Sequence, residues 1–281
     1  MRIAFASGKG GTGKTLLATR TAWRLALRRA RHVTYVDADV EAPNGEILLD
    51  PSLAQRQRVT RPVPALVEGR CDLCRVCVEA CAWNALLPVS AHSLMVFEEL
   101  CHGCGACLLA CPRHALVERP RGTGTLRFGG VGSVRFVSGE LDVGEARPIP
   151  VIQAALEAAP REGLTLVDCP PGTSCPAMAA VRGADCVVLV TEPTPFGLHD
   201  LELAVEMCRA LERPVVAVIN RSDLGDDSVE RYLAREEIRV VGRIPFDPAI
   251  ARAVAAGDLA ALASEPLDAT VDAVLGIAGE A

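Results

Sequence analysis

The sequence predicts an α/β protein built on a parallel β-sheet, with a small cysteine-rich α+β domain inserted into it. Short β-branched runs alternate with Ala- and Leu-rich segments, which is typical of a parallel sheet wrapped by helices. A glycine-rich loop follows the first of these runs at residues 8–15. Eight cysteines in two matching blocks then interrupt the alternation, which indicates a separate inserted unit.

The main domain is expected to contain the following elements in chain order. Strands are expected at residues 2–6, 32–36, 164–167, 186–191, 215–219 and 240–244. Helices are expected at residues 13–29, 149–158, 177–182, 197–211, 228–235, 248–256 and 267–277. Most of these strands end where the chemically informative residues begin, and open α/β sheets bind ligands at that edge.

The insert is expected to span residues 61–118, which leaves 1–60 and 119–281 as one discontinuous domain. Pro62, Pro64 and Gly69 mark its entry, and residues 125–143 indicate a β-hairpin that returns the chain to the main domain. The insert has few aliphatic residues, so we expect groups bound by its cysteines to hold it together.

Composition excludes several classes of protein. The 281 residues are 50% hydrophobic and only 4% aromatic, so the core must consist mostly of Ala, Val, Leu and Ile. The net charge of −6 argues against nucleic acid as the main partner. Five arginines on and just after the first helix are expected to form its solvated face: Arg20, Arg24, Arg28, Arg29 and Arg31.

The cysteines are expected to be reduced, in a cytoplasmic protein. Residues 1–7 form a β-run rather than a signal peptide, and metal-ligand spacing favours a reducing compartment. No apolar stretch reaches the roughly 20 residues that a membrane-spanning helix needs. Residues 267–281 lack Lys and Arg, so we expect no basic membrane anchor there.

The glycine-rich loop matches the phosphate-binding P-loop pattern, G-x4-G-K-T. Its residues are Gly8, Lys9, Gly10, Gly11, Thr12, Gly13, Lys14 and Thr15. Glycines let successive backbone N–H groups turn toward phosphate oxygens, and the helix that follows adds its positive end. We expect Lys14 to bridge the β- and γ-phosphates and the Thr15 hydroxyl to bind Mg²⁺.

Lys9 makes this loop a deviant form of the motif, K-G-G-x-G-K-T, and here the chain resembles the MinD/ParA/Mrp family. The resemblance implies an ATPase that binds ATP or ADP with Mg²⁺ and forms a homodimer around two ATP molecules. It assigns Lys9 a contact with the partner's nucleotide. A heterodimer with a related ATPase is the alternative.

Two further segments resemble the switch regions of this family. Asp37-Ala38-Asp39 closes the second strand, and the resemblance assigns Asp39 to positioning the attacking water, with Asp37 and Asn44 nearby. Residues 168–173 resemble the second switch. There Asp168 would hold Mg²⁺ through water and the Gly172 N–H would bind the γ-phosphate, a contact that hydrolysis releases.

Residues 220–223 and 244–247 resemble the segments that bind the nucleotide base. The resemblance assigns this role to Asn220, Pro245 and Asp247. Arg221 departs from the guanine-type N-K-x-D pattern, so adenine is the expected base.

The two cysteine blocks share the spacing C-x2-C-x2-C-x3-C, and 30 positions separate Cys71 from Cys101. The first block is Cys71, Cys74, Cys77 and Cys81, and the second is Cys101, Cys104, Cys107 and Cys111, followed by Pro112. Thiolates are soft ligands, and this spacing is typical of two cubane iron–sulfur clusters. Zinc is the main alternative, although its sites usually use two separated pairs.

The insert resembles the bacterial two-cluster ferredoxins. The resemblance implies that Cys71, Cys74, Cys77 and Cys111 bind one [4Fe–4S] cluster, and that Cys101, Cys104, Cys107 and Cys81 bind the other. Two features depart from that pattern: Ala82 stands where proline is common, and Arg75-Val76 replaces a small residue that Gly105 keeps in the second block.

The remaining cysteines fall into two groups. Cys186 and Cys208 are expected in the core, whereas Cys169 and Cys175 flank the second switch. Cys175 sits where the nitrogenase iron protein has a ligand of an intersubunit cluster, so a third cluster is one hypothesis and a metal-free thiol is the other. His102 and His114 are expected to be surface residues.

These motifs leave three hypotheses for function. The first is electron transfer through two clusters, gated by ATP hydrolysis in a dimer, with a redox protein as client. The second is ATP-dependent assembly or delivery of iron–sulfur clusters to a client protein, although the C-terminal C-x-x-C of Mrp-type carriers is absent from the sequence. The third is a regulatory switch that uses the clusters as a redox sensor.

Overall fold

The computed structural model describes residues 1–90, 93–259 and 262–280, and it confirms the α/β parallel-sheet fold. Within these residues, a nine-stranded sheet has the order β11-β10-β9-β1-β8-β2-β7-β6-β3. The strands are β11 (Val240–Ile244), β10 (Val215–Asn220), β9 (Cys186–Thr191), β1 (Arg2–Ala6), β8 (Leu164–Asp168), β2 (Val33–Asp37), β7 (Val134–Leu141), β6 (Leu116–Val131) and β3 (Ser52–Leu66). Neighbours are parallel from β11 to β7, and β6 and β3 are antiparallel additions.

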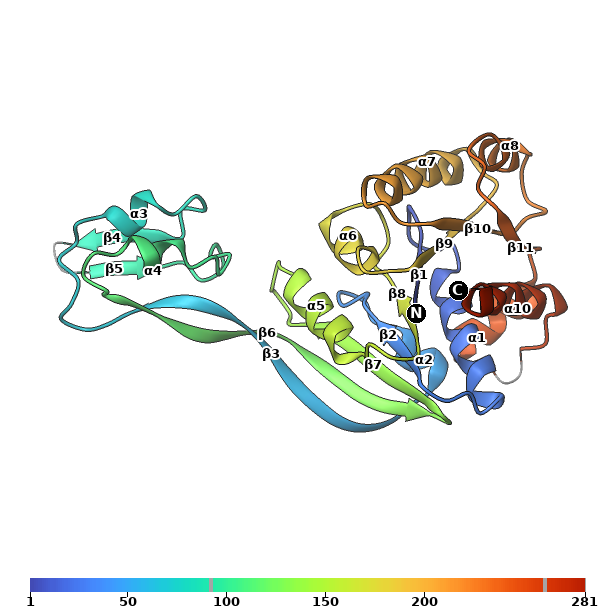
Figure 1. Cartoon of the computed structure of the whole chain (residues 1–281), viewed down its shortest axis with the longest axis horizontal. Helices are drawn as coiled ribbons and strands as arrows, with labels where there is room; N and C mark the ends of the chain where they lie inside the picture. The colour runs from blue at the N-terminus through green and yellow to red at the C-terminus, as the bar shows by residue number, and fades with distance from the viewer. Residues whose placement is uncertain (91–92, 260–261, 281) are drawn as a thin grey trace.

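Helices cover both faces of the parallel part of the sheet (Figure 1). One face packs against α5 (Ile149–Ala158), α6 (Cys175–Val181), α7 (Pro195–Ala210) and α8 (Ser228–Arg235). The other packs against α1 (Lys14–Leu27), α2 (Gly45–Leu49), α9 (Pro248–Ala256) and α10 (Glu265–Glu280). Because both faces are covered, strands such as β9 are buried along their whole length and consist of continuous apolar runs.

The expectation that the α1 arginines form a solvated face is wrong for Arg20. Its guanidinium is buried and donates to the carbonyls of Leu259 and Leu262, at 2.7 and 2.9 Å, and it pairs with Asp268 at 2.9 Å. One turn and two turns further on, ion pairs at 3.0 and 2.8 Å join Arg24 and Arg28 to Asp272. These arginines therefore anchor α10 to α1.

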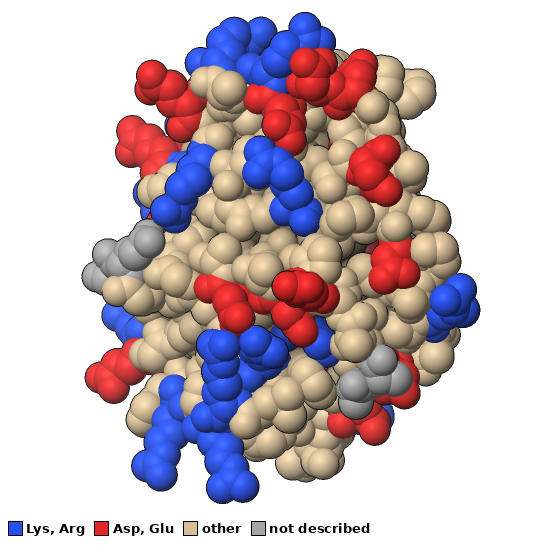
Figure 2. Space-filling view, turned by 90° about the vertical axis from the view of Figure 1, so that its right-hand side faces the viewer, with Lys and Arg blue, Asp and Glu red and all other residues tan. Residues whose placement is uncertain are grey.

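The face turned away from the insert carries both signs of charge. In Figure 2, acidic side chains lie among the basic ones across this face of the main domain. No helix in the described part of the chain is long and apolar enough to cross a membrane.

A long two-stranded ribbon carries the insert away from the sheet (Figure 1). Strands β3 and β6 pair antiparallel from Ser52 opposite Gly130 to Leu66 opposite Leu116. The expected boundaries at residues 61 and 119 both fall inside these strands. The expected hairpin over residues 125–143 is present as the β6–β7 pair, which turns between Val131 and Val134.

The insert is built as two copies of one pattern. It contains α3 (Val76–Glu79), β4 (Leu86–Ser90), β5 (Ser93–Val96) and α4 (Ala106–Ala110). The Val67 N–H donates to the Ala115 carbonyl, and the equivalent Phe97 N–H donates to the Ala85 carbonyl, both at 2.8 Å. Positive φ angles also recur 30 positions apart, at Leu73 and Gly103, Arg75 and Gly105, and Asn84 and His114. The two cysteine blocks therefore occupy equivalent positions.

Candidate nucleotide site and cysteine sites

A cavity of about 560 Å³ lies at the carboxyl ends of the parallel strands of the main domain. Expected site residues that line it are Gly10, Gly11, Thr12, Gly13, Lys14, Thr15, Asp39, Asn44, Asn220, Pro245 and Asp247. The P-loop follows β1, Asp39 follows β2 and Asn220 ends β10, so separate strands bring these residues to one edge.

The P-loop is held against the end of β10. The Asn220 side-chain amide donates to the Thr12 carbonyl at 2.7 Å, and its oxygen accepts from the Arg221 N–H at 3.0 Å. Gly13 has φ 93°, and a Cβ there would lie 2.5 Å from the Asn220 Nδ2. The positive φ and the lack of space for a Cβ both require glycine at position 13. Asn220 thus supports the loop as well as lining the cavity.

Lys14 and Asp168 form a buried ion pair at the base of the cavity. Burial lowers the pKa of the Lys14 ammonium, but the charge of Asp168, its hydrogen bond and the charge of Asp39 together outweigh burial, so the pKa is raised. Asp168 also accepts from the Tyr35 hydroxyl at 3.4 Å. The lysine is thus held in its charged form, which is the form that binds phosphate.

Two more carboxyl groups lie close to this pair. Burial and the charge of Asp168 raise the pKa of Asp37 to about 8. Burial raises the pKa of Asp39 to about 6, against the opposing effect of Lys14. Asp37 is oriented by the N–H groups of Gly45 and Asp39, at 2.8 and 3.2 Å. Asp39 therefore lines the cavity, with Asp37 and Asp168 fully buried close to it, and such a group of carboxyl oxygens is suited to a hydrated divalent cation.

Besides Asp37 and Asp168, three expected residues lie outside this cavity. The Gly172 N–H donates to the Ser7 carbonyl at 2.9 Å, so a contact with phosphate requires this bond to break. Gly8 and Lys9 line a neighbouring cleft, where the Lys9 Nζ lies 3.3 Å from the Glu192 Oε2. The Lys9 side chain is 32% exposed, so a partner can reach it.

The far end of the cavity is apolar. Phe246 is 46% exposed there, and its N–H donates to Asp223 at 2.6 Å. Asp247 accepts from the Ala249 N–H at 2.7 Å and caps α9. Ile250 and Val254 of α9 also line the cavity. These two residues were not predicted to line the site, although the apolar stripe of the expected helix 248–256 could have indicated them.

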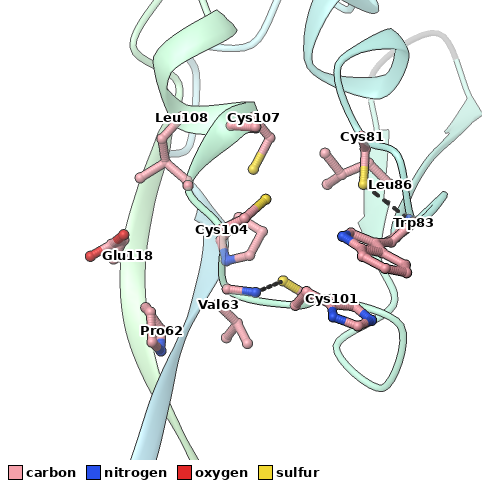
Figure 3. A pocket seen from close by; sticks show the side chains of 16 residues that line it. Pro62, Val63, Cys81, Trp83, Leu86, Cys101, Cys104, Cys107, Leu108 and Glu118 are labelled. Atoms are coloured by element: carbon pink, nitrogen blue, oxygen red, sulfur yellow. Dashed lines mark hydrogen bonds between the residues drawn. The ribbon is translucent and has the colours of Figure 1, made fainter. Parts of the chain in front are cut away.

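The eight insert cysteines line two separate cavities. Cys71, Cys74, Cys77 and Cys111 line the first, which we call the distal site. Cys81, Cys101, Cys104 and Cys107 line the second, the proximal site, where their sulfurs point toward one another (Figure 3). Each cavity takes three cysteines from one block and the fourth from the other.

Backbone donors surround the sulfurs. The Ala85 N–H donates to the Cys81 Sγ and the equivalent Ala115 N–H to the Cys111 Sγ, each at 3.3 Å. Burial raises the pKa of the Cys107 thiol to about 11. A buried thiol of this kind loses its proton when metal binds. Among the described residues, no group of three or more His, Cys, Asp or Glu is arranged around a single ion.

The rims of the two cysteine sites differ at equivalent positions. At the distal site the Arg113 Nε pairs with the Asp72 Oδ2 at 2.7 Å. At the proximal site Trp83 stacks on His102, with ring centroids 3.5 Å apart. His102 is exposed, as expected for a surface residue, and only the 30-position repeat could have indicated its partner.

The other four cysteines lie in the main domain. Cys186 and Cys208 are buried, as expected for core residues. Cys169 is fully buried beside Asp168, and burial raises the pKa of its thiol far above the ordinary value. Cys175 is exposed at the start of α6. Only Cys175 among these four thus lies where solvent or a partner can reach it.

The fold and the P-loop cavity together define a nucleotide-binding protein. The sequence matches the family described as CobQ/CobB/MinD/ParA nucleotide binding domain over residues 3–260. The chain therefore belongs to this family. The cell division ATPase MinD of Pyrococcus furiosus has the same fold, with a TM-score of 0.59 and 21% identity over 100% of this chain and 99% of that one.

Similar sequences include an uncharacterized protein and two proteins named for iron–sulfur chemistry. An uncharacterized protein of Methanocaldococcus jannaschii is 29% identical over 80% of this chain and 82% of its own length. The iron-sulfur cluster carrier protein of Pyrococcus horikoshii is 24% identical over 88% of this chain and 74% of its own. The cytosolic Fe-S cluster assembly factor Nubp1 homolog of Drosophila grimshawi is 30% identical over 38% of this chain.

Proposed function

We propose that this protein is an ATP-dependent iron–sulfur protein in which nucleotide binding and hydrolysis gate electron transfer through two [4Fe–4S] clusters. The clusters would lie in a ferredoxin-like insert at residues 61–118. The observation that carries this proposal is the pair of complete four-cysteine cavities, each assembled from both blocks. That exchange of the fourth cysteine is characteristic of two-cluster ferredoxins.

The C-x2-C-x2-C-x3-C spacing of the two blocks favours cubane clusters over zinc. Zinc draws four ligands around one ion, whereas a cubane takes one thiolate on each of four irons, so its ligands stand further apart. When bound, such clusters accept and release single electrons. Backbone N–H groups at Cys81, Cys101 and Cys111 point at the sulfurs and would tune the potential.

The main domain would supply the nucleotide cycle. Lys14 would contact the β- and γ-phosphates, while Thr15 and Asp168 would hold Mg²⁺, Asp168 through water. Asp39 would position the attacking water. Gly172 would move from the Ser7 carbonyl to the γ-phosphate, and Lys9 would leave Glu192 for the nucleotide of a second subunit. ATP binding would thereby change both the switch loop and the dimer interface.

The second candidate is an ATP-dependent iron–sulfur cluster carrier. It is favoured by the relatives named for that activity and by the exposed Cys175 next to the second switch. Eight cysteines divided between two cavities instead favour resident clusters. Electron transfer is therefore the better-supported proposal for this chain.

The test is the rate at which the clusters are reduced in protein purified without oxygen. With excess reductant, we expect Mg-ATP to change this rate in the native protein and to have no effect in the Lys14→Ala variant. A rate independent of nucleotide in a protein that hydrolyses ATP would refute the gating.

A further inference from the structure

Two arginines hold the backbone of the proximal cysteine site, one from the main domain and one from the base of the insert. Arg147, in the loop between β7 and α5, donates to the Glu99 carbonyl, two residues before Cys101. Arg61, on β3, donates to the carbonyls of Cys101 and Glu98 at 2.9 and 2.6 Å. The backbone that leads into the proximal site is therefore held from both the main domain and the insert.

A buried carboxylate holds these arginines together. Glu145, whose side chain is 4% exposed, lies 3.2 Å from Arg147 and 3.9 Å from both Arg61 and Arg121. The Nε atoms of Arg61 and Arg147 are buried without a hydrogen-bond partner among the described residues. Buried polar atoms without a hydrogen-bond partner raise the free energy of the network. A small displacement can therefore change which arginine pairs with Glu145. We call these four residues the arginine clamp.

The loop that carries Glu145 and Arg147 follows β7, and the end of β7 contacts the residue next to Asp39 of the nucleotide site. The Leu141 N–H donates to the Val40 carbonyl at 2.8 Å, and Val40 directly follows Asp39. A Cβ on Gly139 would lie 2.7 Å from the Val40 Cγ1, so β7 packs tightly against this residue. Through Val40, the segment at Asp39 therefore contacts the strand that leads into the loop carrying Glu145 and Arg147.

The distal site has no such connection. In the part of the chain that the structure describes, its charged rim residues Asp72 and Arg113 pair with each other, inside the insert. No hydrogen bond or ion pair found among the described residues joins 68–79 or 105–115 to the main domain. The two cysteine sites are thus equivalent in their ligands but not in their supports.

We infer that the arginine clamp makes the proximal site, and not the distal one, the site that responds to nucleotide. The inference rests on the proposed function and specifies its regulation. Arg147 is a positioning residue: it acts through the Glu99 carbonyl on the backbone at Cys101, and its hydrogen bonds among the described residues are to Glu145 and Glu99. Nucleotide-driven movement at Val40 changes how Arg147 and Arg61 hold that backbone, and with it the hydrogen bonds and solvent around the proximal sulfurs.

The test is a redox titration followed by electron paramagnetic resonance at pH 8, on the full iron-loaded chain with Mg-ADP or with a non-hydrolysable ATP analogue. The equivalent exposed ligands assign the signals, because Cys104→Ser alters the proximal one and Cys74→Ser the distal one. We expect the exchange of nucleotide to shift only the proximal midpoint, with at least a tenfold change in the reduction equilibrium, or about 59 mV for one electron.

The variants separate the clamp from general stability. Arg147→Ala, and Arg147→Lys if the alanine variant loses iron, should abolish the shift while both signals and ATP hydrolysis persist. Arg113→Ala, the matched distal control, should keep the shift. An equal shift at both sites, no shift in the native protein, or a shift that survives in the Arg147 variants would overturn the inference. Absence of both cluster signals would instead refute the proposed function.

Discussion

The nucleotide-binding domain and the insert are stabilised by different means. The nucleotide-binding domain buries apolar side chains on both faces of its sheet, in two large clusters. The insert has a small cluster in which Leu86, Leu94 and Leu116 pack with Cys77 and Cys107. A core of that size cannot offset the conformational entropy of some 60 residues, so under the proposed function the bound clusters would contribute to folding. A substitution that unfolds the insert should therefore leave the nucleotide-binding domain folded, and the reverse should also hold.

The largest effect should come from a single ligand of the insert. In Cys107→Ser we expect iron to fall from about eight to about four atoms per chain, because one cluster is lost. Hydrogen exchange across the insert should accelerate, while ATP affinity stays unchanged because the nucleotide cavity lies in the other domain. Cys175→Ser is the control, and unchanged iron there would also exclude a third cluster.

Lys14→Ala should be the converse experiment. It removes the phosphate contact and leaves Asp168 buried without its ion-pair partner, so nucleotide binding should weaken by about 2–5 kcal/mol. Calorimetric titration with ATP measures the loss. The visible spectrum of the clusters should not change; if it collapsed, the two parts would not be independent.

A smaller effect is expected where α1 meets α10. Arg20→Leu should destabilise the nucleotide-binding domain by about 2 kcal/mol, because it leaves the Leu259 and Leu262 carbonyls and Asp268 without their donor. Arg28→Leu is the control and should cost less than about 1 kcal/mol, because its ion pair is half exposed. Denaturant unfolding followed by helix content measures both, and equal costs would contradict the buried anchor.

The smallest predicted effect compares the two copies within the insert. Arg75 has φ 67° where the second copy has Gly105 with φ 73°. Arg75→Gly should therefore stabilise the first copy by about 1 kcal/mol, since a non-glycine residue pays a steric cost in this region. Gly105→Ala should destabilise the second copy by a similar amount. Hydrogen exchange in α3 and α4 distinguishes the two, and effects of the same sign would disprove the equivalence.

The parts that sequence could predict are those with strong local signals. The P-loop spacing and the continuous apolar strands indicated the parallel sheet and the loop at its edge, because both follow from backbone geometry. The ribbon was not predicted over residues 52–60, where only Val59 is buried, because an exposed strand such as β3 carries no alternating apolar pattern.

Long-range pairings were beyond the reach of the pattern. A run of arginines on a helix predicts a solvated face. Arg20 is buried because its partners, Asp268 and the carbonyls of Leu259 and Leu262, come from about 240 positions away in the sequence. The arginine clamp is similar, because Arg61, Glu99 and Arg147 come from three separate segments. Such partners depend on topology, which single-residue propensities do not encode.

The most direct measurement is the iron content of the protein, purified without oxygen, before and after ATP turnover in the presence of an apo-ferredoxin acceptor and a chelator. The account predicts that about eight iron atoms per chain are retained, while Mg-ATP changes the rate of cluster reduction. Transfer of iron to the acceptor in proportion to the ATP hydrolysed would contradict it and identify a cluster carrier instead.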